Sequence, residues 1–272
     1  MEIKDKVAVI TGAASGIGNA VCKELARRGA KCIAMVDLSP DVIDAADAIN
    51  QQFEGDPGRA FQGDVTSSEF RSEVFDAICT QHQMVNICVP AAGIVRDSLA
   101  VKVNRSSGRV EMYPVEMFRQ VTEVNLIAPV YWAIETVARM AEYRHQNNLK
   151  RWGPDEEIQG AIIFIGSVAS QGNKGQISYA STKAGLEGAA ATLMKEAIFH
   201  GVRCGVIHPG FTDTPILGAL GDEFLQKHVL PETQLGRLIR PEEIADAICF
   251  MISNQAVSGA LWADAGWHPA AA

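Results

Sequence analysis

The feature that most constrains the fold is a glycine-rich turn near the start of the chain. Residues 7–10 (VAVI) read as a short buried strand, residues 11–18 (TGAASGIG) contain three glycines, and residues 19–28 have the apolar spacing of a helix. A strand that runs through such a turn into a helix brings backbone N–H groups and the positive end of the helix dipole against a pyrophosphate. The pattern favours a dinucleotide-binding unit, and the alternative is an ordinary loop.

Short apolar runs alternate with helical patterns along all 272 residues of the chain, 47% of which are hydrophobic. The predicted strands are residues 7–10, 31–36, 59–63, 85–89, 161–165, 203–207 and 260–263. Several are almost continuously apolar, as expected for strands that are buried on both faces of a parallel sheet. The sequence therefore predicts an α/β fold, a Rossmann-like doubly wound parallel sheet of about seven strands with helices on both faces. We expect residues 1–272 to form a single domain, because no repeat or low-complexity linker interrupts the pattern.

The second predicted strand is followed by Asp37, which bears on the choice of cofactor. A carboxylate at this position can accept hydrogen bonds from the adenosine ribose hydroxyls and would repel a 2′-phosphate. No Lys or Arg occurs at positions 13–15 or 38, where a phosphate would need a partner. We therefore expect NAD rather than NADP as the cofactor. The alternative is that Asp37 caps the turn at Ser39 and Pro40.

Tyr179 and Lys183 stand four residues apart, on one face of a predicted helix, and Ser167 follows an apolar run upstream of them. An ammonium beside a phenol favours the phenolate, so we expect the pKa of Tyr179 to lie below its usual value of about 10. A phenol of this kind, with a hydroxyl beside it, can protonate or deprotonate an alcohol oxygen. Taken alone, the alternative is a chance Tyr–Lys spacing on a helix.

Together these motifs resemble those of the short-chain dehydrogenase/reductase family, in its compact oxidoreductase branch, over nearly the whole chain. In sequence order, the motifs are residues 11–18, Asp64 with Val65, residues 91–93 (AAG), Asn125, Ser167, Tyr179 with Lys183, Pro209 with Gly210, and Thr214. The resemblance implies hydride transfer between a nicotinamide cofactor and carbon, in which the protein supplies orientation and proton control.

The resemblance also implies roles for the candidate catalytic residues. Tyr179 would exchange a proton with the carbonyl or alcohol oxygen, and Ser167 would hydrogen-bond the same oxygen. Lys183 would hold the nicotinamide ribose and lower the pKa of Tyr179, and Asn125 would support a water in a proton relay from Lys183. Two alternatives remain open: Asn125 could satisfy helix backbone, and Ser167 could be a turn-forming serine with Ser170 as its nearest rival.

A set of cofactor contacts follows from the same resemblance. Its members are Gly12, Ser15, Gly16, Ile17, Gly18, Asp37, Asp64, Val65, Ala92, Gly93, Tyr179, Lys183, Pro209, Gly210 and Thr214. Asp64 would reach the adenine amino group with the Val65 amide beside it, and Thr214 would contact the nicotinamide carboxamide. The structural alternatives are a strand-end cap for Asp64 and a helix N-cap for Thr214.

Three stretches depart from the family pattern. Residues 90–93 read PAAG where the family usually has asparagine, so the bracing that an asparagine side chain provides must come from elsewhere. Alternation around turn residues predicts a β-hairpin insertion at residues 98–114, which would shape the substrate mouth, contact a neighbouring subunit or be an exposed decoration. Polar residues 142–159 predict an exposed loop or helix extension without chemistry.

Residues 215–236 predict a substrate lid, because an apolar segment with two glycines can fold over a bound molecule and exclude water. Its apolar character favours a hydrophobic secondary alcohol or its ketone, including a 3-hydroxyacyl thioester. The leading interpretation is an NAD-dependent oxidoreductase that interconverts such a pair. The alternatives are a non-catalytic NAD-binding partner subunit and an NADP-dependent ketone reductase.

Composition excludes several other classes of partner. The net charge of −8 and the pI near 5.3 argue against nucleic acid, which recruits clusters of Lys and Arg. Charged residues begin at Glu2, so we expect no signal peptide, and no apolar run reaches the ~18 residues of a membrane span. Six cysteines without paired spacing indicate a reduced, cytoplasmic protein, and the six histidines predict no metal site. By the resemblance we expect a homo-oligomer, either a tetramer or a dimer.

Overall fold

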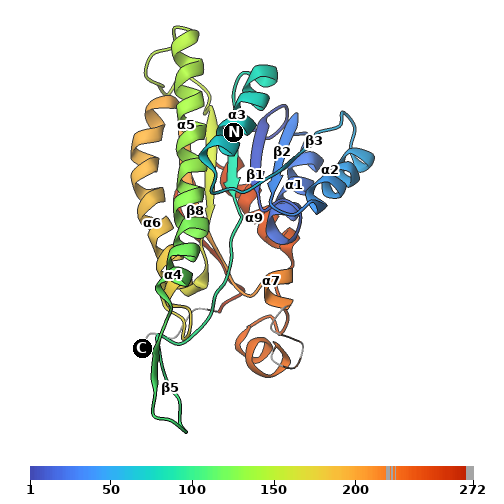
Figure 1. Cartoon of the computed structure of the whole chain (residues 1–272). Coiled ribbons are helices and arrows are strands. Elements are labelled where there is room, and N and C mark those ends of the chain that lie inside the picture. The colour runs from blue at the N-terminus through green and yellow to red at the C-terminus, as the bar shows by residue number, and fades with distance from the viewer. Residues whose placement is uncertain (219–220, 222, 224, 268–272) are drawn as a thin grey trace.

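One sheet of seven parallel strands organises the chain (Figure 1). The computed structural model describes residues 1–218, 221, 223 and 225–267. The strands are β1 (Val7–Thr11), β2 (Cys32–Asp37), β3 (Gly58–Gln62), β4 (Ile87–Pro90), β7 (Gly160–Ile165), β8 (Val202–Pro209) and β9 (Gly259–Ala263), and they lie in the order β3-β2-β1-β4-β7-β8-β9. Every neighbouring pair is parallel. All seven predicted strands are present, with bounds that differ by one or two residues, and the predicted α/β fold is confirmed.

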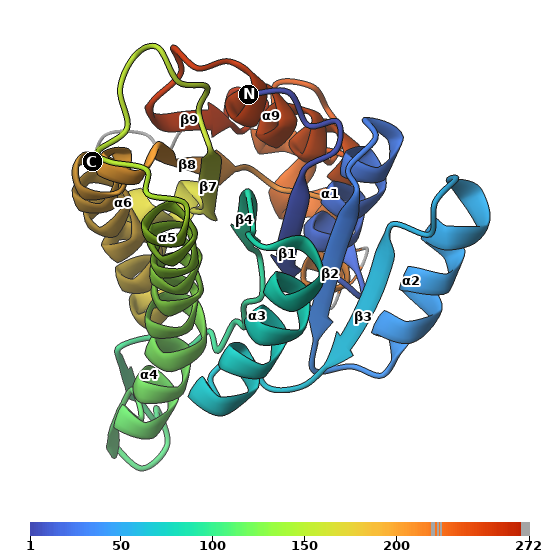
Figure 2. The ribbon, with the colours of Figure 1, turned by 90° about the horizontal axis from the view of Figure 1, so that it is seen from above.

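Helices cover both faces of this sheet (Figure 2). The α-helices are α1 (Gly16–Arg27), α2 (Asp41–Gln52), α3 (Ser68–His82), α4 (Val115–Thr122), α5 (Ala128–Gln146), α6 (Ile177–Ala197), α7 (Pro215–Gly218) and α9 (Pro241–Ser253). Hydrophobic residues of α1, α2 and α9 form one buried cluster with the sheet, and those of α3, α5 and α6 form the other. No helix within the described residues has the length and apolar content needed to cross a membrane.

The first strand shows why the apolar runs are continuous. Val7 and Val9 face the cluster of α3, α5 and α6, whereas Ala8 and Ile10 face the cluster of α1, α2 and α9. Successive side chains of a strand point to opposite faces, so covering both faces requires apolar residues at every position. The glycine-rich turn that follows this strand is thereby held at the edge of a rigid sheet.

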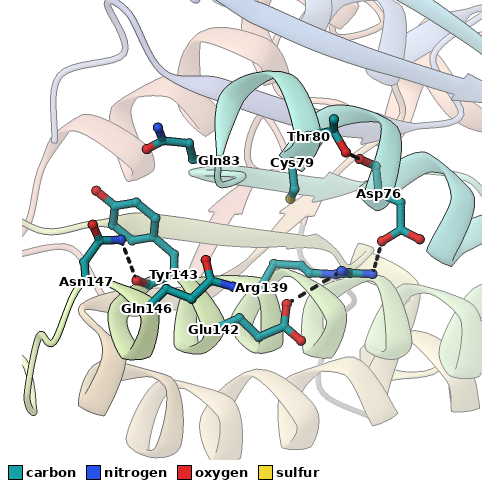
Figure 3. A pocket seen from close by; sticks show the side chains of 9 residues that line it. All are labelled: Asp76, Cys79, Thr80, Gln83, Arg139, Glu142, Tyr143, Gln146 and Asn147. Atoms are coloured by element: carbon teal, nitrogen blue, oxygen red, sulfur yellow. Dashed lines mark hydrogen bonds and ion pairs between the residues drawn. The ribbon is translucent and has the colours of Figure 1, made fainter.

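On the face covered by α3 and α5, a cavity of about 480 Å³ opens between the C-terminal parts of these two helices (Figure 3). The C-terminal ends of both helices lead toward the start of a strand, α3 to β4 and α5 to β7, so the cavity lies at the amino-terminal edge of the sheet. The Arg139 guanidinium crosses it and pairs with Asp76 at 2.7 Å and with Glu142 at 3.6 Å. The charged groups that line the cavity therefore pair with one another. The cavity lies at the edge of the sheet opposite the glycine-rich turn.

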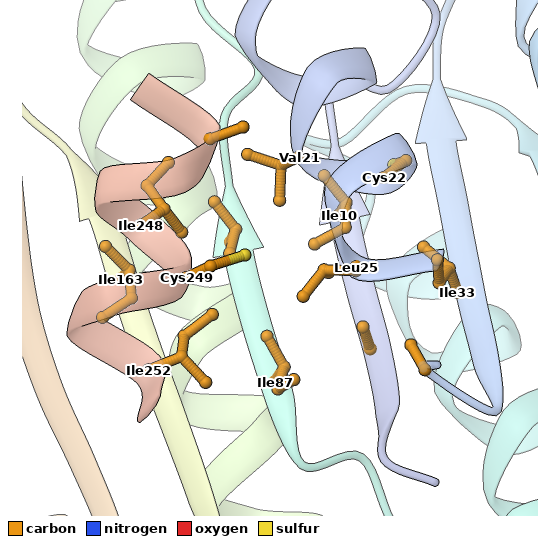
Figure 4. Packing of buried hydrophobic residues seen from close by; sticks show 14 of the residues in the cluster. Ile10, Val21, Cys22, Leu25, Ile33, Ile87, Ile163, Ile248, Cys249 and Ile252 are labelled. Carbon is orange, nitrogen blue, oxygen red and sulfur yellow. The ribbon is translucent and has the colours of Figure 1, made fainter. Parts of the chain in front are cut away.

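On the other face, α9 packs against α1 and the middle of the sheet (Figure 4). Ile248 and Ile252 of α9 point toward Leu25 of α1 and toward Ile87 and Ile163 of the strands. All are buried, and truncation of such a side chain to alanine typically costs 2–5 kcal/mol. This contact ties the last helix of the chain to the first.

A two-stranded antiparallel sheet, β5 (Val101–Val103) and β6 (Val110–Met112), lies within the predicted insertion 98–114 and projects from the body (Figure 1). All six of its residues are exposed. Its base is attached to the body by Tyr113, whose hydroxyl donates to the carbonyl of Arg96 at 2.6 Å and lies 2.9 Å from the hydroxyl of Ser178. The insertion is therefore anchored one residue away from Tyr179.

The polar segment 142–159 is only in part the exposed loop that the sequence predicts. Helix α5 continues to Gln146, and Arg144 in its last turn is 2% exposed. The Arg144 guanidinium pairs with Glu156 at 2.8 Å and donates to the carbonyl of Lys150, so it fastens the loop that leads into β7. The segment is therefore a helix extension up to Gln146 and a largely exposed loop beyond it, and Arg144 is its buried exception.

Replacing Arg144 with Met is expected to lower the free energy of unfolding by about 2 kcal/mol, because the carbonyl of Lys150 loses a charged donor and Glu156 loses its partner. Urea unfolding of the variant measures the change. Arg105→Met removes the same charge from the exposed insertion and should leave stability within about 0.5 kcal/mol of the wild type. Equal stabilities of the two variants would contradict an anchoring role for Arg144.

The segment expected to form the lid, 215–236, contains α7, a π-helical turn at Leu225–Val229 and a 3-10 turn at Leu230–Glu232. Leu225 and Val229 are buried, whereas Ile216 is exposed. Positions 219, 220, 222 and 224 of the expected lid lie outside the described residues.

Candidate active site

The predicted site residues gather where the parallel strands end. Gly12 follows β1, Asp37 ends β2, Ala92 and Gly93 lie just beyond β4, Ser167 lies just beyond β7, and Pro209 and Gly210 close β8. Because the strands are parallel, all of these positions lie at the same, carboxyl-terminal edge of the sheet. Ligands of open α/β sheets bind at this edge.

The glycine-rich turn is packed so tightly that side chains cannot replace two of its glycines. Gly12 has φ +67°, and a Cβ atom added there would lie 2.8 Å from the backbone nitrogen of Ala92. A Cβ atom at Gly18 would lie 2.2 Å from the carbonyl oxygen of Gly12. Ser15 precedes α1 with extended backbone, and its side chain makes no capping hydrogen bond to the N-terminus of this helix. Such a terminus suits an anion.

Gly16, Ile17 and Thr214 complete the surroundings of this turn. A Cβ atom at Gly16 would lie 3.2 Å from the Thr214 methyl group, so β8 and its following loop approach the turn closely. Ile17 is half-buried and packs against the core. The Thr214 hydroxyl donates to the carbonyl of Thr212 at 3.3 Å. Thr214 therefore lies beside the glycine-rich turn, although the two are about two hundred residues apart in the chain.

Asp37 caps the turn at Ser39, which is the alternative to cofactor binding that the sequence leaves open, and it also contacts the glycine-rich turn. One carboxylate oxygen accepts a hydrogen bond from the Ser39 amide at 2.9 Å, and the other accepts one from the Ala14 amide at 3.0 Å. A carboxylate has about four acceptor positions, so both oxygens can still accept from a ligand. The negative charge of Asp37 is thus fixed against the turn.

Asp64 and Val65 follow β3 and make local contacts. Asp64 accepts hydrogen bonds from the amide and the hydroxyl of Thr66, at 2.9 and 2.8 Å, which is the strand-end cap named above as the alternative. The carbonyl of Val65 accepts from the indole of Trp132 at 2.9 Å. These bonds hold both residues at the same edge as Asp37.

The loop after β4 is braced by residues from two other elements, in place of the asparagine that its own sequence lacks. The Ala92 amide donates to the Thr11 hydroxyl at 3.1 Å. Asn125 accepts from the amide of Ile94 and donates to its carbonyl, both at 2.8 Å. Asn125 is fully buried in a π-helical turn, Glu123–Ile127, that joins α4 to α5. Such turns are frequent at functional sites.

Tyr179, Lys183 and Ser167 lie together beside this loop. Ser167 accepts from the amide of Ala169 at 3.1 Å, and its side chain hydrogen-bonds Tyr179. Lys183 is 6% exposed, and its ammonium donates to the carbonyl of Ile165 at 2.7 Å. The same ammonium lies 5.5 Å from the centroid of the Tyr179 ring. A phenol, a hydroxyl and an ammonium placed in this way can pass a proton to or from a carbonyl oxygen.

The sequence predicts a lowered pKa for Tyr179, but in the structure this pKa is raised. Burial is the main cause, the hydrogen bond with Ser167 opposes it, and the nearby charge of Asp97 adds to it. Lys183 is not among these causes, because its own pKa is the lower of the two and its charge is lost before Tyr179 titrates. Burial lowers the pKa of Lys183 to about 8, so Lys183 is mostly charged at neutral pH and loses its charge just above it.

Asp97 is a neighbour of Tyr179 that the sequence did not reveal. Its carboxylate accepts a hydrogen bond from the side chain of Gln176 at 2.8 Å, and the adjacent Ser98 amide donates to Gly175 at 2.8 Å. These bonds join the loop after β4 to the start of α6. No motif marks the contact, because Asp97 and Gln176 are 79 positions apart.

The site provides no ready ligands for a metal. Within the part of the chain that the structure describes, no group of three or more His, Cys, Asp or Glu side chains could hold a metal ion.

Comparisons with known proteins agree with this geometry. The chain matches the family model described as short chain dehydrogenase over residues 6–223. It is 34% identical to 3-oxoacyl-[acyl-carrier-protein] reductase FabG from Vibrio cholerae serotype O1 and 32% identical to the protein of that name from Escherichia coli K12, in both cases over 94% of this chain and 93% of the relative.

A solved structure described as ribose-5-phosphate isomerase from Brucella melitensis 16M superposes with a TM-score of 0.80 at 25% identity, covering 98% of this chain and 93% of that one. The reductases and the isomerase are named for different reactions, so the shared fold does not by itself choose between them. The family match and the reductase relatives agree with each other, and the chain belongs to the short-chain dehydrogenase family.

Proposed function

We propose that this protein is an NAD-dependent oxidoreductase that interconverts a secondary alcohol and its ketone. The observation that carries the proposal is the gathering of Tyr179, Ser167 and Lys183 at the edge where the glycine-rich turn ends. The close approach at Gly12 and Gly18, and a helix start that no Ser15 side chain covers, fit the pyrophosphate of a dinucleotide.

In the proposed reaction the nicotinamide, when bound, supplies or accepts the hydride. Tyr179 gives its proton to the carbonyl oxygen in reduction, and takes it back in oxidation. Its raised pKa keeps the phenol protonated, which suits the reductive direction. Ser167 donates its hydroxyl hydrogen to the same oxygen, and Lys183 holds the ribose and resupplies the proton. Asn125 keeps the loop of Gly93 and Ile94 in place beside them.

Two observations support a 3-oxoacyl thioester as the ketone. The relatives from Vibrio cholerae and Escherichia coli are named as reductases of 3-oxoacyl groups on acyl carrier protein. The segment 215–236, our proposed lid, carries apolar side chains that can cover an acyl chain. Purified protein assayed at the reduced-nicotinamide absorbance band with 3-oxoacyl thioesters and simple ketones tests the proposal. Tight NADH binding without turnover of any substrate would favour the non-catalytic partner subunit instead.

The preference for NAD rests on Asp37. Replacing it with Asn is expected to raise the affinity for NADPH relative to NADH by about tenfold, because a charge that repels the 2′-phosphate is removed. Fluorescence titration of the two reduced cofactors measures the ratio. Asp41→Asn removes an equal charge from the first turn of α2 and should leave the ratio unchanged. Wild-type protein that binds NADPH more tightly than NADH would refute the preference.

A homo-oligomer, a dimer or tetramer, is part of the proposal. Ile127, Tyr131 and Ile134 are exposed and follow one another at spacings of four and three residues. They therefore form an apolar stripe that runs from the end of the π-helical turn onto α5, of the kind that a second helix covers.

A further inference from the structure

His208, the penultimate residue of β8, is fully buried directly behind Ser167. Its ring stacks on that of Trp262 with centroids 4.3 Å apart and planes 17° apart. Gly166 also lies against the ring, since a Cβ atom there would be 2.5 Å from Nδ1 of His208. The ring is thus held in place by both residues.

The two ring nitrogens face different partners. Nδ1 lies 3.2 Å from the amide nitrogen of Ser167 and 3.0 Å from its carbonyl oxygen. Nε2 lies 3.5 Å from Oε1 of Glu187, and neither of these two buried atoms has another hydrogen-bond partner. A carboxylate oxygen and an unprotonated nitrogen would repel each other, so a proton must lie between Nε2 and Oε1.

This accounting favours one tautomer, because a proton on Nε2 serves two otherwise unpartnered atoms, whereas a proton on Nδ1 would serve only the carbonyl oxygen of Ser167. With the proton on Nε2, Nδ1 carries a lone pair and accepts the hydrogen bond from the Ser167 amide. The chain of contacts then runs from Glu187 through the imidazole to the backbone of Ser167. Ser167 has extended backbone there, and its hydroxyl oxygen accepts from Ala169, which leaves the hydroxyl hydrogen to point at Tyr179 or at a substrate.

We propose that Glu187 and the buried His208 share a proton and that this pair positions Ser167, so that His208 is a positioning residue for the reaction. The inference rests on the proposed function only for the experiments that measure kcat; the NMR experiment below does not depend on it. Glu187 lies one helical turn beyond Lys183, which in turn lies one turn beyond Tyr179, so one face of α6 carries both the reacting groups and the support of the serine.

Protonation of His208 would break this arrangement, because an Nδ1–H can no longer accept from the Ser167 amide. The groups facing the ring are Ser167 and Ser170 from the loop after β7, Trp262 from β9, and Glu187 and Lys183 from α6. Burial lowers the pKa of His208 most strongly, Lys183 lowers it further, and Ser167 and Glu187 raise it. The ring is therefore neutral at neutral pH and gains its proton only in acid.

Ketone reduction is the direction in which to test this, since Tyr179 stays protonated in acid and Lys183 stays charged below about pH 8. An acid limb, that is a fall of kcat toward low pH, would then report the protonation of a group other than Tyr179 and Lys183, and we expect that group to be His208. Glu187→Gln removes a charge that raises the pKa of His208, so the acid limb should move to lower pH. Glu196→Gln, an exposed change on the same helix, should leave the profile in place.

Two substitutions at His208 separate positioning from packing. Leu fills the space against Trp262 but cannot accept from Ser167, and kcat should fall about 10- to 100-fold with little change in NADH affinity. His208→Asn places an acceptor near the position of Nδ1 and should recover part of the loss. Values of kcat within threefold of the wild type for His208→Leu would overturn the inference.

A third measurement needs no turnover and no folded His208→Leu protein. Nitrogen-15 NMR of histidine-labelled wild-type protein reports the tautomer of each of the six histidines, and His208→Asn identifies the signal by its loss. A neutral ring with its proton on Nε2 is expected at pH 7. A proton on Nδ1, or a charged ring, would overturn the inference. If instead no substrate turns over while the expected tautomer is found, it is the proposed function that fails.

Discussion

Tyr179→Phe is expected to lower kcat about a thousandfold while the protein continues to bind NADH. The phenylalanine keeps the ring beside the Lys183 ammonium but removes the hydroxyl group that transfers a proton to the substrate oxygen, and leaves that oxygen only the hydrogen bond from Ser167. The hydrogen bond that Ser167 makes to this hydroxyl is lost as well, and that bond is small beside the loss of the proton donor. Initial rates of ketone reduction and fluorescence titration with NADH measure the two effects separately.

Tyr143→Phe is the matched control. Tyr143 lies in the cavity between α3 and α5, at the opposite edge of the sheet, and the substitution also removes one phenolic hydroxyl (Figure 3). Its rates should equal those of the wild type. If Tyr179→Phe retained a tenth or more of the wild-type kcat, the proton would have to come from another group, and the assignment of Tyr179 would fail.

Gly18→Ala is expected to lower the free energy of unfolding by about 3 kcal/mol and to weaken NADH binding at least tenfold. The added methyl group would lie 2.2 Å from the carbonyl oxygen of Gly12, a backbone atom that cannot move without displacing the whole turn. Because Gly12 itself lies against the backbone of Ala92, the displacement is opposed by the loop after β4. Urea unfolding and NADH titration measure the two losses.

Gly188→Ala provides the contrast on another helix. Gly188 lies within α6, and nothing lies within 4 Å of where its Cβ would be. Alanine is the better helix former by about 1 kcal/mol, so this substitution should leave stability unchanged or raise it. Destabilisation of similar size in both variants would mean that the tight packing at Gly18 is not what constrains the turn.

The fold could be predicted because its signals are local. A strand buried on both faces is apolar at nearly every position, as β1 is, so its apolar run can be recognised without knowing what it packs against. The parallel arrangement then brings Gly12, Asp37 and Ser167 to one edge, although they are far apart in the chain. Most of the predicted bounds differ from those of the structure by one or two residues, since hydrogen bonding rather than hydrophobicity decides where a strand ends.

What the sequence did not reveal depends on contacts between distant segments. The raised pKa of Tyr179 arises from burial and from Asp97, neither of which is visible in the spacing of Tyr179 and Lys183. The Thr11 hydroxyl takes over part of the bracing of the β4 loop, which a reading of residues 90–93 alone could not assign. Arg144 looked like one more polar residue of an exposed segment because its partner Glu156 lies twelve positions further on.

The π-helical turn at Glu123–Ile127 has a consequence for the rotational phase of the helix that contains it. A π turn holds one residue more than a regular turn, and each residue of an α-helix advances the side chains by about 100°. Deleting one residue from this turn would rotate Asn125 and the side chains of α5 relative to each other by about 100° around the helix axis. This one extra residue therefore lets Asn125 point inward to Ile94 while Tyr131 and Ile134 point outward. The orientation of the active-site edge and that of the proposed subunit surface both depend on it.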